Sequence, residues 1–205
     1  VGINEEGSEG GAIHVNGELV NDRKGVFYVN QGGCLDVNQG GKLANEGQIT
    51  GNEGGAIFVN GGFLHSVPGS SIEAAEGCSV TVRGDGSNLA AEGDFVTRNL
   101  TLVEGGYSNL MGTARLYGEV HIYEDSNLDI AGNVQNNGYL CVHPNAILSI
   151  YEDAELTNNG AADISEAPYI DNGGFTEISG TVRNYGLMSV GINEEGSEGS
   201  AIHVN

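Results

Sequence analysis

The chain has 205 residues, with 28 acidic and 7 basic side chains and a formal net charge of −21. Such a charge repels nucleic acid and anionic lipid, so we expect neither nucleic-acid binding nor membrane insertion. No apolar stretch approaches the ~18 residues of a membrane-spanning helix. Glycine occurs 35 times against 3 prolines and no tryptophan, which predicts many tight turns rather than disorder.

The first sixteen residues of the chain recur almost unchanged at its end. Residues 1–16 read VGINEEGSEGGAIHVN and residues 190–205 read VGINEEGSEGSAIHVN, so the copies differ only at Gly11 and Ser200 and are offset by 189 residues. We therefore expect residues 1–189 to be one complete unit of a tandem array, followed by the start of the next. The repeat junction then consists of Val190, Gly191, Ile192 and Asn193.

A short unit of the form apolar–x–apolar recurs about every 21 residues, and it has the alternation of a strand with one buried face. In chain order these units are residues 13–15, 35–37, 57–59, 80–82, 100–102, 120–122, 140–142, 162–164, 182–184 and 202–204. Their nine intervals fill the 189-residue offset. His203 should therefore repeat the position of His14 one unit further along.

Two further apolar series follow each of these units. The second series contains Leu43, Leu64, Leu89, Leu110, Leu128, Leu148, Ile170 and Val190, and the third contains Phe27, Ile49, Ile72, Val96, Leu116, Val134, Leu156 and Ile178. Three short strands per rung of ~21 residues, separated by Asn–Gly turns, predict an all-β fold, a three-faced parallel β-solenoid with about nine rungs per 189-residue unit. A β-sandwich would not keep this period, and the period of a β-propeller is about twice as long.

Three asparagines occupy the same place in successive rungs, directly after the first strand of each. Asn16, Asn38 and Asn60 are predicted to form a structural ladder in which stacked side chains bond to one another. The alternative is that each asparagine only tolerates the backbone conformation of its turn.

Two motifs near the N-terminus carry a family resemblance. The sequence GGAI occurs at residues 10–13 and 54–57, and residues 27–30 read FYVN, which fits an FxxN motif. In these motifs the chain resembles right-handed parallel β-helix (pectin-lyase-like) repeat surface proteins, including polymorphic outer-membrane proteins and bacterial adhesins. The resemblance implies a right-handed solenoid, export to the extracellular space or cell surface, and an adhesive or structural role.

Calcium is the one metal that the sequence suggests, at Asp125, Asn127 and Asp129. These residues present oxygen atoms at alternate positions, as calcium loops do. A calcium loop would have glycine at its sixth position and glutamate at its twelfth, where this chain has Ile130 and Asn136. A solvated acidic turn is therefore the favoured interpretation, and no other cofactor is expected.

Histidines and cysteines show no metal-binding spacing in the sequence alone. His14 and His121 occupy the outward position of the first strand but lie five rungs apart, roughly 24 Å at the usual strand spacing. Cys141 is likewise expected to point outward. Cys34 and Cys78 lie two rungs apart, about 10 Å, which is too far for a disulfide.

No catalytic residues are predicted, because the seven basic residues are not grouped with carboxylates on one rung face as a polysaccharide lyase requires. We expect a structural subunit or tandem repeat of a long extracellular or cell-surface fibre, whose partners are other copies of itself stacked end to end. The alternatives are an adhesin that binds surface glycans or host molecules and, less favoured, a polysaccharide lyase or hydrolase. One unit of nine rungs would be about 43 Å long at the usual strand spacing.

Overall fold

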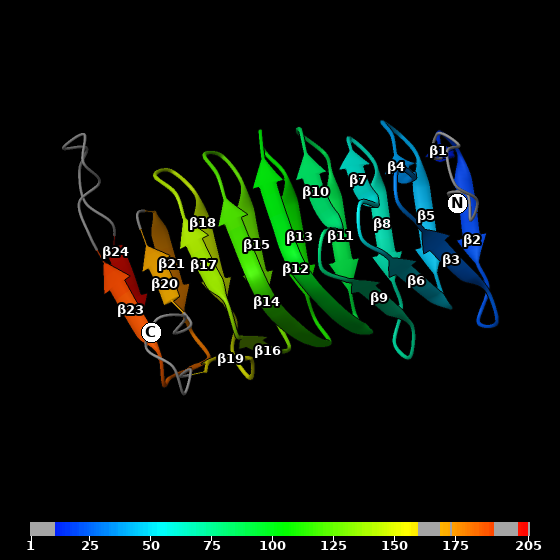
Figure 1. The fold of residues 1–205 in the computed structure, drawn as a ribbon. Coiled ribbons are helices and arrows are strands. Elements are labelled where there is room, and N and C mark those ends of the chain that lie inside the picture. The colour runs from blue at the N-terminus through cyan, green and yellow to red at the C-terminus, as the bar shows by residue number, and fades with distance from the viewer. Residues whose placement is uncertain (1–10, 160–168, 173, 191–200, 205) are drawn as a thin grey trace.

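The computed structural model describes residues 11–159, 169–172, 174–190 and 201–204. These residues form 24 β-strands, and no helix is present among them. Every strand pair in this part of the chain is parallel, and each strand pairs with strands one turn before or after it. Figure 1 shows the strands stacked along one axis, from β1 and β2 at the right to β23 and β24 at the left. The fold is an all-β parallel β-solenoid, as the sequence predicts.

The strands form three series of parallel pairs, which we call ladders one, two and three. Ladder one contains β1 (Ala12–Val15), β4 (Cys34–Val37), β7 (Ala56–Asn60), β10 (Ser79–Arg83), the second halves of β12 (Asp94–Val103) and β14 (Thr113–Ile122), β17 (Tyr139–Val142), β20 (Tyr169–Asn172) and β23 (Leu187–Val190).

Ladder two contains β2 (Glu18–Asn21), β5 (Lys42–Asn45), β8 (Phe63–Ser66), β11 (Asn88–Ala91), β13 (Tyr107–Leu110), β15 (Asn127–Ile130), β18 (Ile147–Ile150), β21 (Phe175–Ile178) and β24 (Ala201–Val204). Ladder three contains β3 (Val26–Val29), β6 (Gln48–Gly51), β9 (Ser71–Ala74), the first halves of β12 and β14, β16 (Asn133–Asn136), β19 (Glu155–Asn158) and β22 (Thr181–Asn184).

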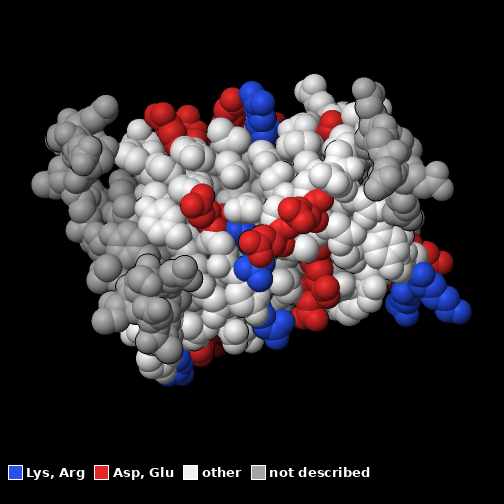
Figure 2. Space-filling model, viewed as in Figure 1, with Lys and Arg blue, Asp and Glu red and all other residues white. Residues whose placement is uncertain are grey.

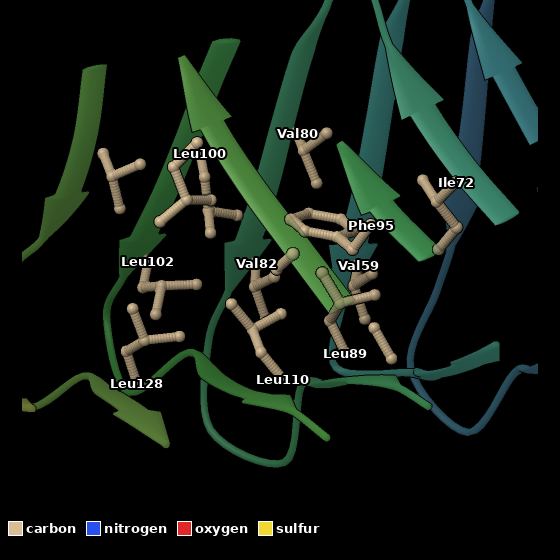
Figure 3. Packing of buried hydrophobic residues seen from close by; sticks show 14 of the residues in the cluster. Val59, Ile72, Val80, Val82, Leu89, Phe95, Leu100, Leu102, Leu110 and Leu128 are labelled. Atoms are coloured by element: carbon tan, nitrogen blue, oxygen red, sulfur yellow. The ribbon is translucent and has the colours of Figure 1, made fainter. Parts of the chain in front are cut away.

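The core lies between the ladders, where apolar residues of one turn stack on apolar residues of the next. In ladder one, Leu35 pairs with Ile57 and Ile57 with Val80, and all three side chains are almost fully buried. Alternate residues of each strand point inward, so every turn adds another apolar layer. Figure 3 shows the centre of this stack, where Phe95 of β12 packs among aliphatic side chains. Phe95 is the largest fully buried side chain of the described core.

β12 and β14 have 10 residues each, against 4 or 5 in the other strands, because each runs from ladder three into ladder one without a turn. The pairing of β12 with β14 shifts between Thr97 and Asn99, which marks the corner. A Cβ atom on Gly118 would lie 2.0 Å from the carbonyl oxygen of Arg98, and one on Gly138 would lie 2.2 Å from that of Gly118. Glycine is required at this corner because the backbones of successive turns approach so closely.

In ladder one the predicted register is correct from β1 to β17 and wrong after it. β17 pairs with β20, so Tyr139 lies beside Tyr169 and this turn takes 30 residues instead of about 21. Residues 162–164, where the next strand of ladder one was expected, lie outside the described residues. Residues 182–184 belong to β22 in ladder three, not to ladder one. The apolar–x–apolar pattern is the same in all three ladders, so it could not reveal a longer turn.

In ladder two, Ser108 takes the place predicted for Leu110, and in ladder three Phe95 and Ala114 take the places predicted for Val96 and Leu116. Ile170 and Val190, predicted for the second series, lie in ladder one, and Ile178, predicted for the third, lies in ladder two.

The long turn also shifts the two copies of the repeated sequence relative to each other. β1, which contains His14, lies in ladder one, whereas β24, which contains His203, pairs with β21 in ladder two. The expectation that His203 takes the position of His14 is therefore wrong. The count of nine rungs and the hand of the solenoid stay predictions.

Buried asparagines form ladders inside the solenoid that the sequence analysis did not identify. Asn21 donates to Asn45 at 2.7 Å, and Asn45 donates to Ser66 Oγ at 3.0 Å and to the Ser71 carbonyl at 3.0 Å. Near the other end, Asn136 donates to Asn158 at 2.9 Å and Asn158 to Asn184 at 2.6 Å. These amides satisfy polar groups in the interior where the chain turns a corner.

Replacing Asn45 by alanine should lower the free energy of unfolding by about 2 kcal/mol, because the neighbouring polar groups would lose buried hydrogen bonds. Urea unfolding followed by circular dichroism measures the change. The matched control is Asn16→Ala, which removes an exposed amide bonded to Asn38 and should cost no more than about 0.5 kcal/mol. Equal losses in the two variants would contradict a structural role for the buried ladder.

Candidate functional site

The predicted ladder of Asn16, Asn38 and Asn60 is not continuous in the structure. Asn38 Nδ2 lies 3.0 Å from Asn16 Oδ1, but Asn60 donates to Asp36 Oδ1 at 2.7 Å instead of bonding to Asn38. With its amide turned over, Asn38 donates to Asp36 Oδ2 at 2.9 Å. His14 also lies 3.4 Å from this carboxylate. The Asp36 carboxylate on β4 is thus the centre of this group of polar side chains. It accepts the hydrogen bond from Asn60 that the predicted ladder would have given to Asn38.

The three proposed calcium ligands come from an exposed turn and from β15, the strand that follows it. Asp125 is an exposed turn residue with a φ of 61°, a conformation that aspartate tolerates better than most residues. Asn127 and Asp129 lie on the outward side of β15, and Asp129 is only 3% exposed. The Oδ1 atoms of Asn127 and Asp129 are buried without a hydrogen-bond partner among the described residues. Calcium binding at these three residues stays a prediction.

Two tyrosine hydroxyls donate hydrogen bonds to Oδ2, the other carboxylate oxygen of Asp129. Tyr107 donates to Asp129 Oδ2 at 2.6 Å, and Tyr151 donates to the same atom at 2.9 Å. Burial, together with the hydrogen bond to Asp129, raises the pKa of Tyr107 well above its usual range. The bond to Asp129 also raises the pKa of Tyr151. Because both hydroxyls donate to Oδ2, only Oδ1 of Asp129 is left to bind a cation.

At the predicted repeat junction, Val190 is the last residue of β23 in ladder one. Gly191, Ile192 and Asn193 lie outside the described residues.

The strongest cluster of reactive side chains combines His121, Cys141 and His143. β14 and β17 pair so that His121 lies beside Cys141, and His143 follows directly after β17. Their potential metal-ligand atoms all lie within 4.8 Å of one another. His121 Nδ1 and His143 Nε2 are 3.1 Å apart, a distance at which one imidazole donates to the other. Cys141 is 7% exposed, and none of the chain's three cysteines forms a disulfide.

Aromatic rings and a carboxylate surround this cluster. Tyr123 stacks on His143, with ring centroids 4.1 Å apart and planes 12° apart, and it stacks on His121 at 5.6 Å. Tyr139 meets the His121 ring edge-on at 5.7 Å. Glu119 Oε2 lies 3.6 Å from His121 Nε2, the ring nitrogen that faces away from His143. The two imidazoles are therefore fixed in orientation by neighbours on the same strands.

The sequence analysis missed this cluster because it compared His121 only with histidines in other rungs. The signal was available: Cys141 follows His121 by one rung, and His143 follows Cys141 by two residues, so all three point to the same side. The prediction that Cys141 points outward is correct, but its neighbours bury it.

A shallow polar groove of about 350 Å³ runs along ladder three, where the first residues of successive strands line up. Its polar lining comes from Gln48, Ser71, Glu73, Glu92, Asp94 and Thr113. In the view of Figure 2 the basic side chains appear as small separate groups, several of them beside carboxylates. Within the described residues, no helix capable of spanning a membrane is found.

The fold defines the chain as a parallel β-solenoid, and comparisons with known proteins add little to that class. No family model and no curated protein match the sequence. Among solved structures, a TibC-catalysed, hyper-glycosylated fragment of TibA aligns with 97% of this chain and 72% of the fragment, with 19% identity and a TM-score of 0.32. The resemblance of the GGAI and FxxN motifs to surface β-helix proteins stays a prediction.

Replacing Asp129 by asparagine should lower the pKa values of Tyr107 and Tyr151, because the charge that holds both hydroxyls protonated is lost. A raised tyrosine pKa in the folded state stabilises the fold below pH ~10 and loses that contribution as the pH rises further. The wild type should therefore lose stability above pH ~10, and Asp129→Asn should lose less.

Ultraviolet titration of tyrosinate and denaturant unfolding on both sides of that pH measure the two effects. Asp153→Asn, at an exposed turn residue, is the control and should titrate like the wild type. A tyrosinate titration of Asp129→Asn that overlays the wild-type curve would contradict the assignment.

Proposed function

We propose that this chain is a structural segment of an extracellular or cell-surface rod, built by end-to-end stacking of copies of itself. The observation that carries the proposal is the arrangement of strands at the two ends of the described solenoid. β1, β2 and β3 begin ladders one, two and three, and β23, β24 and β22 are the last strands of the same three ladders.

Each of these six strands has one paired neighbour among the described strands. An unpaired edge of a parallel strand presents backbone donors and acceptors that another strand can bind. β1 and β2 of one copy can therefore pair with β23 and β24 of the next, which continues ladders one and two. In ladder three, β22 lies one turn behind β23 and β24, so one further strand is needed between β22 and β3.

Partly buried core residues at the two ends of the described solenoid also favour end-to-end stacking. Ile13, Leu19 and Phe27 occupy core positions of the first turn, and Val182 does so in the last described turn of ladder three. All four are only partly buried, whereas Leu35, Leu43 and Ile49, their equivalents one turn inside, are at most 1% exposed. A stacked copy would cover these side chains, and burial of apolar surface stabilises association by about 25 cal/mol per Å² before its costs are subtracted.

The alternative function is an adhesin that binds glycans. The polar groove along ladder three offers the hydroxyl, amide and carboxylate groups that sugars bind, but its lining contains no aromatic ring for a sugar to stack on. The exposed aromatic residues are Tyr28, Tyr117, Tyr123, Tyr151, Phe175 and Tyr185. Tyr28 pairs with Thr50 and Phe175 with Ile147, not with another exposed aromatic residue. The groove favours glycan binding as a second role, with the rod as the first.

We propose no catalytic role for the chain. Three of its arginines are held in surface ion pairs: Arg23 with Glu46, Arg83 with Glu104 and Arg183 with Glu155, at 2.8 to 3.7 Å. An arginine paired in this way is a poor base for abstracting a proton from a sugar ring. Activity on acidic polysaccharides would speak against this part of the proposal.

Self-association should increase with protein and salt concentration, because the charge of −21 makes copies repel one another and salt screens that repulsion. Leu19→Lys should abolish association by placing a charge at the end of the core. Ile147→Lys, on an outward position of ladder two and two pairing steps from its last described strand, should associate like the wild type. Sedimentation velocity and negative-stain electron microscopy measure the assemblies.

Rods that lengthen in multiples of one unit are the expected product. A wild type that stays monomeric at high protein and salt concentration, or equal loss of association in both variants, would refute end-to-end stacking.

A further inference from the structure

We propose that His121, Cys141 and His143 form a binding site for a divalent transition-metal ion, with Zn²⁺ as the preferred ion. The three side chains supply two imidazole nitrogens and one thiol sulfur on one side of the solenoid, with their potential ligand atoms within 4.8 Å of one another. This site is independent of end-to-end stacking, because it lies on the side of the rod at β14 and β17.

The chemistry of the ligand atoms, two nitrogens and one sulfur, favours a transition-metal ion. Nitrogen and thiolate ligands suit Zn²⁺ and its neighbours in the transition series, whereas Ca²⁺ and Mg²⁺ require oxygen ligands. Two histidines and one cysteine give three protein ligands and leave a fourth position open, as in zinc sites that keep a bound water. The cluster thus differs in chemistry from the oxygen-only group around Asp129.

The spacing of the ligand atoms fits a tetrahedral ion. With Zn–N bonds of ~2.05 Å, two nitrogens of a tetrahedron lie about 3.3 Å apart, and a nitrogen and a sulfur about 3.6 Å apart. His121 Nδ1 and His143 Nε2 are 3.1 Å apart, close to that edge. The largest separation within the group is at most 4.8 Å, so binding requires ligand movements of about 1 Å at most, within reach of small side-chain rotations.

In the metal-free protein, ring nitrogens and the Cys141 thiol carry protons that a bound ion displaces. One imidazole donates a hydrogen bond to the other across the 3.1 Å contact, and the ion takes the place of that N–H proton. The donating imidazole releases this proton to solvent and takes up another at its other ring nitrogen, so it stays neutral, and the thiol of Cys141 releases its proton to solvent. For His121 that other nitrogen is Nε2, which lies 3.6 Å from Glu119 Oε2.

Glu119 therefore supplies the carboxylate that commonly orients a metal-bound histidine. Tyr123 holds the ring of His143 by stacking at 4.1 Å, and Tyr139 lies edge-on to His121 at 5.7 Å. Since His121 and Cys141 lie on paired strands of ladder one, the backbone fixes their separation. The ligands are thus held close to a binding geometry before the ion arrives, which reduces the entropy lost on binding.

Titration of the untagged, reduced, metal-free protein with Co²⁺ tests the site, because tetrahedral Co²⁺ with a thiolate ligand gives strong visible and near-ultraviolet bands. Competition with Zn²⁺ then gives the Zn²⁺ affinity. We expect one ion per chain and thiolate-to-cobalt absorption. Cys141→Ser should remove that absorption and weaken Zn²⁺ binding by roughly 100-fold or more, and Glu119→Gln should weaken it by about 10-fold.

Cys34→Ser and His14→Ala are the matched controls, because both residues lie on ladder one outside the cluster. Circular dichroism of each variant confirms that the fold is retained. Absence of a stoichiometric Co²⁺ spectrum in the wild type would overturn the proposal. Binding that is unchanged in Cys141→Ser and His143→Ala, or lost equally in the controls, would do the same.

Discussion

Backbone hydrogen bonds between successive turns run along the axis of this molecule, and they force each residue to lie beside its counterpart one turn later. Neighbouring strands lie ~4.8 Å apart in that direction. A residue that is buried in one turn therefore needs an apolar partner in the next, which is why Leu35, Ile57 and Val80 form one continuous stack. Among the described strands, the first and last of each ladder have one paired neighbour each, and the core residues Ile13, Leu19, Phe27 and Val182 in them are only partly buried.

Stacking also brings polar side chains together that are about twenty residues apart in the chain. Inside the solenoid it produces the bonded pairs Asn21–Asn45 and Asn136–Asn158. On the outside it places His121 beside Cys141, and Tyr107 one turn from Asp129. A functional group on such a rod is therefore most readily built from the same strand position in adjacent turns, with one further residue two positions along.

The sequence was sufficient to predict the fold class and the register of ladder one up to β17, because apolar residues alternate and recur at a nearly constant interval. It failed where the interval changed, at the 30-residue step from Tyr139 to Tyr169, since a strand of ladder three has the same local pattern as one of ladder one. The sites were harder to predict. Asn60 bonds to Asp36 and not to Asn38, and this choice depends on charge and distance that only the stacked structure provides.

The register of the ladders is the central claim, and a distance between two spin labels tests it most directly. Lys42 and Ile147 are outward residues of ladder two, five pairing steps apart, which corresponds to about 24 Å between their backbones. With the three cysteines replaced by alanine and labels placed at these positions, pulsed electron paramagnetic resonance should give one narrow distribution near that distance, shifted only by the label linkers. A broad distribution, or a mean beyond about twice that distance, would contradict the parallel ladder.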